Sequence, residues 1–490
     1  MVAAAPGVRS GSAAALALAL AAVPAASAAA AGLEEAVRSI TAADAYAVVE
    51  RLAAPEFAGR LTGTPGYAAA AVWAAAALRD AGLTPPPSLP DYLQPFEVTL
   101  GGVESASLLL LPVAEAEKPR ELELSKDFVP FLFSGSGAVT AEVVFVGYGI
   151  SAPELGRDDY AGLDVAGKVV MTVRGAPKDG RDWRAHDSHR RRTANARAHG
   201  AAGYLFAESA VANPNGVPIA DLPMAAIGQA IADELLSARG LEVAELTKVL
   251  EQGGVASFAT GRRVELVVRA RPARRAEGHN VVAMVSGRDP ALAGEYLVVG
   301  AHLDHCGDWP VLLPGADDNA SGSAAVLEIA RAVAVVEPRP PRTMVFVLFG
   351  GEEMGLLGSQ HFVRSPPAGL TRCVAMLNLD MVGAGNGVWV AGGENFPALC
   401  TALGAARDRF APGFGVSCGR VDLTAEQRAD HGPFLGAGVP AVSLFGSGGQ
   451  HRGYHTGDDG LWWITPRTIE AAARTAFGAA LALAESPPVP

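Results

Sequence analysis

Continuous apolar runs that alternate with helix-like segments are the feature that most constrains how this sequence can fold. Between residues 280 and 393 the runs NVVAMVSG, EYLVVGAHLD, RTMVFVLFGG, CVAMLNLDMVG and VWVAGG are separated by segments such as ASGSAAVLEIARAVAVV, whose apolar residues recur at helical spacing. Strands buried on both faces read as uninterrupted apolar runs, and their alternation with helices is typical of parallel sheets covered by helices. We therefore predict an α/β fold with a mixed, largely parallel central sheet flanked by helices.

The 490 residues are enough for about two to three domains. Residues 33–99 hold two segments of helical periodicity joined by the Gly-rich turn AGRLTGTPG, and they are predicted as the N-terminal helical part of the main domain. Residues 100–275 change to short Val-rich runs split by Gly and Pro, which predicts a smaller, mostly β insert. Its one helical segment carries Arg190, Arg191 and Arg192, predicted to form a solvated helix face. The main domain then resumes over 276–485.

The N-terminus resembles a secretory signal peptide. Residues 1–28 contain one Arg, a short apolar run and the sequence Ala-Ser-Ala at their end, which is typical of a cleavage site. We therefore predict a secreted or periplasmic protein without stable membrane insertion, because no later segment has membrane length without charges. The formal net charge of −12 argues against a nucleic-acid partner.

An exported chain can form disulfides, so its cysteines are candidates for one or two of them. Four cysteines allow three full pairings, and the sequence does not choose among these or exclude buried free thiols. The four are Cys306, Cys373, Cys400 and Cys418.

Polar residues gather where the strand-like runs of the main domain end. Each of them alone has an ordinary structural explanation, but four consecutive runs that all end in a metal-type ligand do not. Carboxylates crowded at one sheet edge repel each other and lose hydration unless a cation neutralises them. These residues are His302, Asp304, Asp317, Asp318, Glu352, Glu353, Asp380 and His455.

The donor types indicate which cation. Imidazoles with carboxylates and no thiolate fit zinc or another first-row divalent ion better than calcium. Two histidines and at least three acids exceed the three protein ligands usual at one catalytic zinc. We therefore predict two ions roughly 3.5 to 4 Å apart, bridged by the carboxylate of Asp317.

Five motifs, in order, resemble the M28 family of zinc metallopeptidases: AHLDH, GADDNASG, FGGEEMGLLGS, LNLDMVG and YHTGDD. The resemblance covers about residues 276–480 and, more loosely, AGRLTGTPG. Within the insert, VVFVGYGISAPELGRDDYAGLDVAGKVVM and ARAHGAAGYLF more loosely resemble the protease-associated (PA) domain that such peptidases often carry.

The M28 resemblance implies a division of roles. One zinc is expected on His302, Asp317 and Asp380, and the other on Asp317, Glu353 and His455. Glu352 is expected to be the general base that takes a proton from a metal-activated water. Asp304 is expected to accept the His302 imidazole N–H and fix its tautomer. Tyr454 is expected either to face the oxyanion or to pack. The remaining polar neighbours are predicted to shape turns or position loops: His305, Cys306, Asp308, Asp318, Asp430, His431, Asp458 and Asp459.

The predicted function is an exported dinuclear-zinc aminopeptidase that removes N-terminal residues from peptides. A carboxypeptidase of the same family would need arginines for the substrate carboxylate, and Arg420, Arg428 and Arg452 lie in the right part of the chain. A single-zinc branch of the family resembles glutaminyl cyclase, and the ligand set favours two ions over it. A non-catalytic binding protein on the same scaffold is the alternative from another class, distinguished by its metal content.

Overall fold

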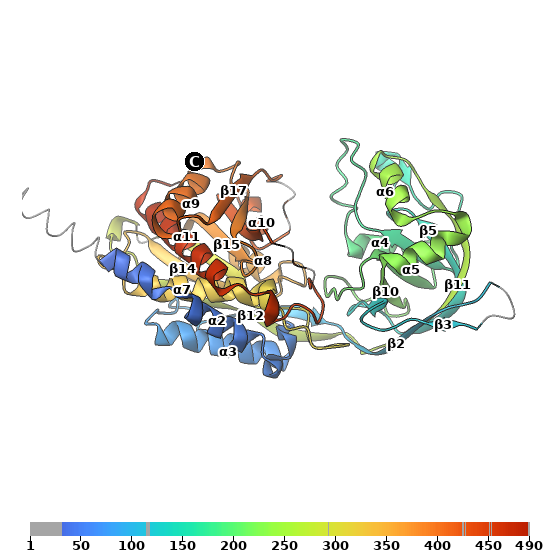
Figure 1. The fold of residues 1–490 in the computed structure, drawn as a ribbon, viewed down its shortest axis with the longest axis horizontal. Helices are drawn as coiled ribbons and strands as arrows, with labels where there is room; N and C mark the ends of the chain where they lie inside the picture. The colour runs from blue at the N-terminus through green and yellow to red at the C-terminus, as the bar shows by residue number, and fades with distance from the viewer. Residues whose placement is uncertain are drawn as a thin grey trace, which may run out of the picture.

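The computed structural model describes residues 32–113, 118–292, 294–423, 426, 428–449, 451 and 453–488. The chain forms two bodies, each built on an eight-stranded sheet (Figure 1). We call them the main domain, with the described residues of 32–100 and 274–488, and the insert, with those of 103–270. The predicted signal peptide lies outside the described residues.

The sheet of the main domain is mixed, with four parallel strands at its centre. The parallel strands lie in the order β14-β13-β15-β18, and antiparallel β12 and β16 flank them. This confirms the predicted fold class. Across the sheet the strands are β1 (Leu93–Leu100), β12 (Arg274–Val285), β14 (Thr343–Phe349), β13 (Glu295–His302), β15 (Arg372–Asp380), β18 (Ala441–Ser447), β16 (Gly387–Ala391) and β17 (Gly415–Gly419).

Helices cover both faces of this sheet, which explains why its strands read as uninterrupted apolar runs. In β13, Leu297 and Val299 enter one core, whereas Val298 enters the other. The first core is shared with α2 (Ala42–Leu52), α3 (Pro65–Asp80), α7 (Gly322–Ala334), α9 (Pro397–Phe410) and α11 (Pro466–Glu485). The second is shared with α8 (Leu357–Arg364) and α10 (His431–Gly436).

The insert has its own sheet and two apolar cores. The order β3-β2-β11-β5-β8-β9-β10-β4 places four parallel strands, β5 to β10, side by side. Its strands are β2 (Val103–Leu110), β3 (Arg120–Glu121), β4 (Phe128–Pro130), β5 (Gly137–Val146), β8 (Val169–Val173), β9 (Gly203–Glu208), β10 (Met224–Gly228) and β11 (Ser257–Ala270). Its helices include α4 (His189–Ala198), α5 (Gln229–Leu236) and α6 (Val243–Glu251).

One prediction for α4 is wrong. Arg192 is not solvated but 2% exposed. Its guanidinium donates to the main-chain oxygens of Tyr148 and Gly175 and pairs with Asp187. A buried arginine needs such partners, and the run of three arginines in the sequence gave no sign of them.

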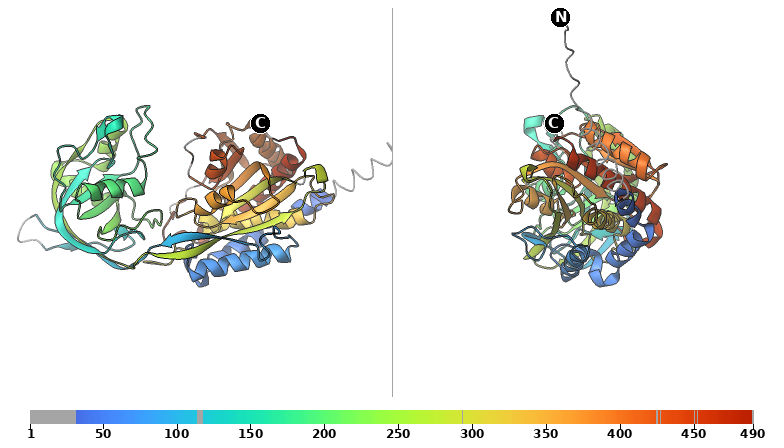
Figure 2. Two further views of the ribbon diagram at one scale, coloured as in Figure 1. Left: turned by 180° about the vertical axis from the view of Figure 1, so that it is seen from behind. Right: turned by 90° about the vertical axis from the view of Figure 1, so that its left-hand side faces the viewer.

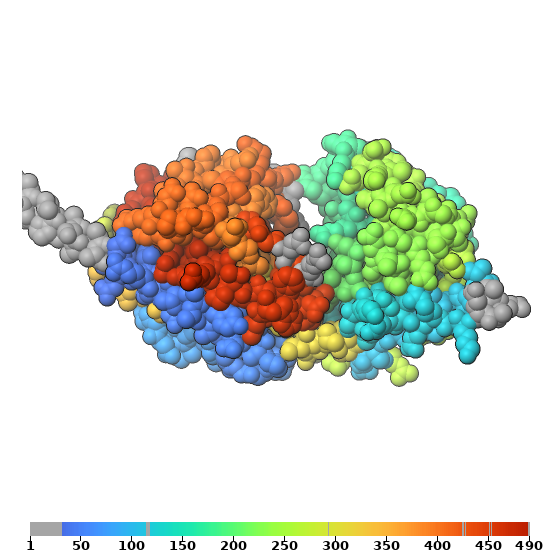
Figure 3. All heavy atoms as spheres, viewed as in Figure 1, coloured from blue at the N-terminus to red at the C-terminus, as the bar shows by residue number. Residues whose placement is uncertain are grey.

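A two-stranded ribbon joins the two bodies. The chain leaves the main sheet after β1 and enters the insert sheet as β2, and it returns through β11 into β12 (Figure 2). Between the sheets the Arg271 N–H donates to the Gly102 oxygen at 2.9 Å. Residues 33–99, predicted as helical, therefore end in the edge strand β1. In the space-filling view the bodies meet over part of their facing sides, with an open gap above (Figure 3).

The cysteines divide into one pair and two thiols. Cys400 in α9 and Cys418 in β17 form a disulfide, while Cys306 and Cys373 are free. Among the described helices, none combines the length and the apolar character needed to cross a bilayer.

Candidate metal centre

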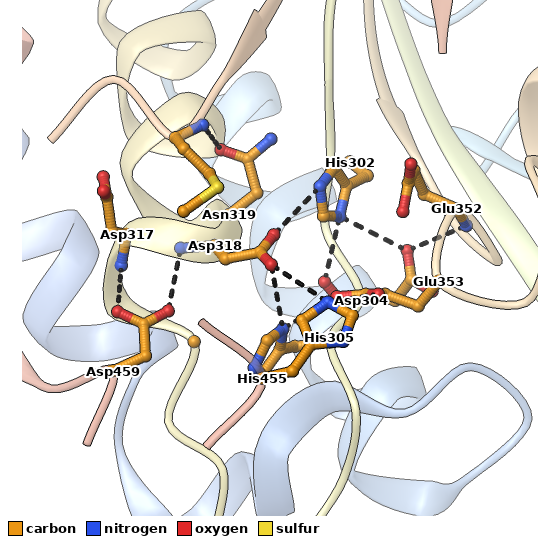
Figure 4. Close-up of polar contacts among 12 residues, drawn as sticks. His302, Asp304, His305, Asp317, Asp318, Asn319, Glu352, Glu353, His455 and Asp459 are labelled. Carbon is orange, nitrogen blue, oxygen red and sulfur yellow. Dashed lines mark hydrogen bonds and ion pairs between the residues drawn. The ribbon is translucent and has the colours of Figure 1, made fainter. Parts of the chain in front are cut away.

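The polar cluster lies at the carboxyl ends of the four central parallel strands. His302 is the last residue of β13 and Asp380 the last of β15, and Glu353 follows β14 by four residues. Asp318 belongs to the turn Ala316–Ser321 that leads into α7, and His455 to the loop after β18. Segments separated by up to about 150 residues thus meet at one sheet edge (Figure 4), as the topology of open parallel sheets favours.

The carboxylate of Asp318 stands between two histidines. Its Oδ1 is 3.3 Å from His302 Nε2, and its Oδ2 is 3.2 Å from His455 Nε2. On one side the group is completed by Asp380, whose Oδ1 is 3.5 Å from His302 Nε2. On the other it is completed by Glu353, whose Oε2 is 2.9 Å from His455 Nε2. The Asp318 carboxylate is therefore shared by two groups of possible metal-ligand atoms.

The bridging position predicted for Asp317 is taken by its neighbour Asp318. The Asp317 carboxylate points away from the histidines (Figure 4) and accepts the Gly383 N–H at 2.7 Å. Asp318 lies in a non-helical part of the turn, with φ −102° and ψ 94°, so consecutive side chains leave the chain in different directions. The two acids are equivalent in the motif ADDNAS, and only the backbone of the turn distinguishes them.

Two residues predicted as turn residues lie beside Glu353. The His305 Nδ1 is 2.8 Å from Glu353 Oε1 and 3.9 Å from Asp318 Oδ2. One ligand-type atom from each of four buried residues lies within 4.8 Å of the others: His305, Cys306, Glu353 and His455. A second such group consists of His302, Asp318 and Asp380. The structure thus brings together all the predicted ligands except Asp317.

The pKa values of the cluster residues reflect burial and the charges of their neighbours. Burial opposes ionisation of Glu353, but the facing His455 and His305 outweigh it and lower its pKa to about 2. At Glu352 burial dominates, and with the charge of Glu353 it raises the pKa well above the ordinary value. Burial favours neutral His302, yet the charges of Glu352, Asp318 and Asp380 raise its pKa well above the usual range. The site therefore attracts positive charge strongly.

The donor arrangement fits metal ions. A main-chain carbonyl only accepts, so His455 donates its Nδ1 proton to the Ala212 oxygen, at 2.8 Å. In that tautomer Nε2 presents a lone pair to the carboxylates of Glu353 and Asp318. His302 repeats the pattern, with Nδ1 3.2 Å from the Asp304 carbonyl oxygen and Nε2 facing Asp318 and Asp380. Lone pairs that converge in this way are suited to binding a cation, and imidazole with carboxylate is a ligand set suited to zinc.

Asp304 and Glu352 lie beside the ligands and contact each other. The Asp304 carboxylate is 3.8 Å from His302 Nδ1, farther than its own carbonyl oxygen. It accepts the Glu352 N–H at 3.2 Å, and burial raises its pKa to about 7. We predicted that the Asp304 carboxylate accepts the His302 imidazole N–H. In the structure the main-chain oxygen of Asp304 lies closer to that nitrogen than the carboxylate does.

Tyr454 lies at the open side of the cluster. Its ring stacks on the His455 ring, with centroids 3.8 Å apart and planes at 19°, and the residue is 47% exposed. The packing role is therefore visible in the structure. A role toward an oxyanion stays a prediction.

Asp459, predicted as a turn residue, holds the bridging turn. Its two carboxylate oxygens accept the N–H groups of Asp317 and Asp318, each at 2.9 Å, and His451 Nε2 lies 3.0 Å from Oδ1. The group is completely buried. The sequence gives no signal for this contact, since it joins residues 141 and 142 positions apart.

Arg60 is a second residue that sequence reasoning missed. Its fully buried guanidinium donates to the main-chain oxygens of Leu303, Leu52, Pro314 and Gly315 at 2.6 to 2.8 Å. Burial lowers its pKa to about 10. One side chain from the Gly-rich turn thus ties together the loops that follow β13 and precede Asp318.

Comparisons with known proteins agree with this geometry. Residues 280–480 match the model of peptidase family M28, and residues 139–235 match that of the PA domain. The chain is 32% identical over 235 residues to leupeptin-inactivating enzyme 1 of Streptomyces exfoliatus, covering 44% of this chain and half of that enzyme. It is 27% identical over 419 residues to an aminopeptidase of Pseudomonas aeruginosa strain UCBPP-PA14, covering 81% of this chain and 68% of the relative.

A solved structure shares the fold. BSAP, a zinc aminopeptidase from Bacillus subtilis, superposes with a TM-score of 0.61 at 20% identity, over 90% of this chain and 94% of that one. At this identity the likeness concerns the fold, including the presence of both bodies.

Proposed function

Because the chain belongs to peptidase family M28 and carries a PA domain as an insert, we propose that it is an aminopeptidase that uses two zinc ions. The relatives named above as aminopeptidases support the reaction. The peptide substrate follows from the same membership.

The observation that carries the proposal is the carboxylate of Asp318 between His302 and His455. Four buried or nearly buried carboxylates can carry four negative charges, and protonation of both imidazoles would supply only two positive ones. The four are Asp318, Glu352, Glu353 and Asp380. Two divalent ions match this charge, and a shared carboxylate is how paired metal sites are built. A single zinc, as in the cyclase branch, would leave one of the two groups of donors without its cation.

We assign the first ion to His302, Asp380 and Asp318, and the second to Glu353, His455 and Asp318. The bridge moves from Asp317 to Asp318, and the other four predicted ligands keep their places. His305 is assigned to the hydrogen bond with Glu353, which fixes the orientation of that ligand. When bound, the ions supply Lewis-acid polarisation of the peptide carbonyl and acidify water.

Glu352 is proposed as the general base. Its main chain is held by Asp304 at 3.2 Å, and one of its carboxylate oxygens lies within 4.8 Å of ligand atoms of His302 and Glu353. Burial raises its pKa, which makes the carboxylate a stronger proton acceptor. Glu352 would accept the proton of the attacking water and return it to the leaving amine.

The charge around the centre favours recognition of a free amine over a carboxylate. Asp380 and Glu352 are acids of the cluster that could attract an N-terminal ammonium group. The arginines considered for a carboxypeptidase are engaged elsewhere: Arg428 forms hydrogen bonds with Glu426, and Arg420 lies 3.7 Å from Glu394. Arg452 lies outside the described residues.

Metal content and substrate choice test the proposal together. Purified protein is expected to contain two zinc ions per chain and to hydrolyse amino-acid p-nitroanilides. An N-blocked dipeptide with a free C-terminus is expected to stay intact. Cleavage of the blocked dipeptide alone would indicate a carboxypeptidase. Protein without metal and without activity would indicate the non-catalytic binding protein.

Export remains part of the proposal and rests on residues 1–28. Expression of the full chain in a bacterium should yield mature protein outside the cytoplasm that begins after Ala28. N-terminal sequencing checks this, and an intact N-terminus on cytoplasmic protein would contradict it.

A further inference from the structure

A loop of the insert reaches into the metal centre. This insert loop, residues 209–220, follows β9 and brings Ala212 against His455. The Ala212 N–H donates to the His455 oxygen at 3.0 Å, and His455 Nδ1 donates to the Ala212 oxygen at 2.8 Å. A single residue of the insert therefore holds both the main chain and the ring of one proposed ligand.

The insert loop is fixed on both sides of Ala212. The Ala212 side chain is 3% exposed and packs with Cys306 and Leu313 of the main domain. On the insert side, the Asn213 side-chain amide lies 3.1 Å from His189 Nε2. Farther along, the loop helps to line a pocket at the junction of the two bodies: Pro214, Gly216 and Pro218 face Leu61, Leu100 and Met354.

The two proposed ions differ in what orients their histidines. The Nδ1 of His302 faces Asp304 of the main domain, two residues away in the sequence. The Nδ1 of His455 faces a residue of the insert 243 positions away. The other ring nitrogen of a ligating histidine almost always donates to such a partner, which fixes the tautomer and the ring orientation.

We infer that the insert is a positioning element of the metal centre, and that Ala212 prepares His455 to bind the second ion. The inference rests on the proposed function. The Ala212 carbonyl holds the proton on Nδ1, so that Nε2 keeps its lone pair toward Glu353 and Asp318. The first ion is held by the main domain alone, whereas the second depends on docking of the insert.

Displacing the insert loop should weaken only the second ion. Loss of such a partner typically costs 10–100-fold in metal affinity. Ala212→Leu adds volume against Cys306 and Leu313 and is expected to push the carbonyl away from His455. Ala212→Gly keeps the carbonyl and removes only a methyl group. Val217→Thr changes a side chain of the same loop that is 42% exposed.

The experiment measures both zinc affinities by competition with a chromogenic chelator on the full chain. In Ala212→Leu one of the two affinities, assigned to the second ion, is expected to fall roughly 10–100-fold, with the other unchanged. Ala212→Gly and Val217→Thr should remain within about twofold of the unsubstituted protein. Asn213→Ala, which releases the loop from His189 without adding volume, should weaken the same ion by a smaller factor.

The outcomes separate the inference from the proposed function. If the unsubstituted protein binds no zinc, the proposed function is wrong. If it binds two ions and Ala212→Leu and Asn213→Ala bind them equally well, the positioning role of the insert is wrong. Equal weakening of both ions in Ala212→Leu would also overturn it, because that result indicates a general structural defect.

Discussion

The main domain and the insert have similar sheets, yet among the described residues only the main domain gathers a candidate metal centre. Each has eight strands with four parallel ones in the middle. At the carboxyl ends of the insert strands, Arg174 follows β8 and pairs with Glu208, the last residue of β9, at 2.6 Å. Deeper in the insert, Arg157 and Asp159 pair at 2.8 Å and are fully or almost fully buried. Each of these two insert pairs thus joins an arginine to a carboxylate.

The corresponding edge of the main domain has no such balance. Its acids face imidazoles and each other, and the nearby buried Arg60 donates its hydrogen bonds to main-chain oxygens. The comparison teaches that a parallel sheet supplies an edge where loops converge, and that uncompensated charge at this edge makes it a cation site.

The strongest test of this contrast uses two adjacent acids. Asp318→Ala is expected to lose both ions and to reduce activity to background, because both groups of donors share that carboxylate. Asp317→Ala removes only the acceptor of the Gly383 N–H and is expected to retain zinc. Metal analysis and p-nitroanilide hydrolysis of the two variants decide the matter. If Asp317→Ala loses metal while Asp318→Ala keeps it, the bridge belongs to Asp317.

A second substitution separates chemistry from metal binding. Glu352→Gln keeps the shape of the side chain but cannot accept a proton, so zinc should stay bound while kcat falls by roughly 10²–10⁴-fold. Steady-state kinetics with zinc analysis measures both quantities. Unchanged kcat at full zinc content would remove Glu352 from the mechanism.

The sequence predicted the sheet and the grouping of most candidate ligands because both depend on local patterns. Uninterrupted apolar runs mark doubly covered strands, and His302 and Asp380 end such runs, while Glu353 follows another by four residues. The choice between Asp317 and Asp318 failed because it depends on the dihedral angles of one turn. The motif offers two identical side chains for one position.

Contacts between distant segments were not predictable for another reason. Asp459 accepts the main-chain N–H groups of its partners, and Ala212 contacts His455 through its own main-chain N–H and C=O. Every residue except proline carries both groups. No residue type therefore marks such a contact in the sequence. The buried Arg192 and the strand β1 were missed similarly, since their environment is created by tertiary packing.

Substitutions of Asp459 and of its neighbour Asp458 test whether Asp459 stabilises the turn that carries Asp318. Asp459→Ala leaves the N–H groups of Asp317 and Asp318 buried without their acceptor, which costs about 1–3 kcal/mol per unsatisfied group. We expect a lower free energy of unfolding and weaker zinc binding. The adjacent Asp458 is exposed, and Asp458→Ala should change neither. Urea unfolding and chelator competition provide the measurements, and equal behaviour of the two variants would deny Asp459 its supporting role.

The smallest expected effect concerns the insert, whose stability should decrease in acid through His189. Burial, together with Arg192 and Arg174, lowers the pKa of His189 to about 3 from the ordinary 6.5. Between these values the unfolded chain binds a proton that the folded insert does not, so stability falls as the pH decreases. From pH 7 to pH 5 the free energy of unfolding of the insert should decrease by about 2 kcal/mol.

His189→Gln keeps a neutral acceptor for Asn213 and removes the titration, so this pH dependence should disappear in the variant. Hydrogen exchange of the β9 amides in urea at both pH values follows the insert alone. Chelation of zinc should lower the protection of the β9 amides by a similar amount at both pH values, because the insert loop that follows β9 docks on His455. If the pH dependence of β9 exchange persisted in His189→Gln, a group other than His189 would cause it, and the role assigned to His189 would be wrong.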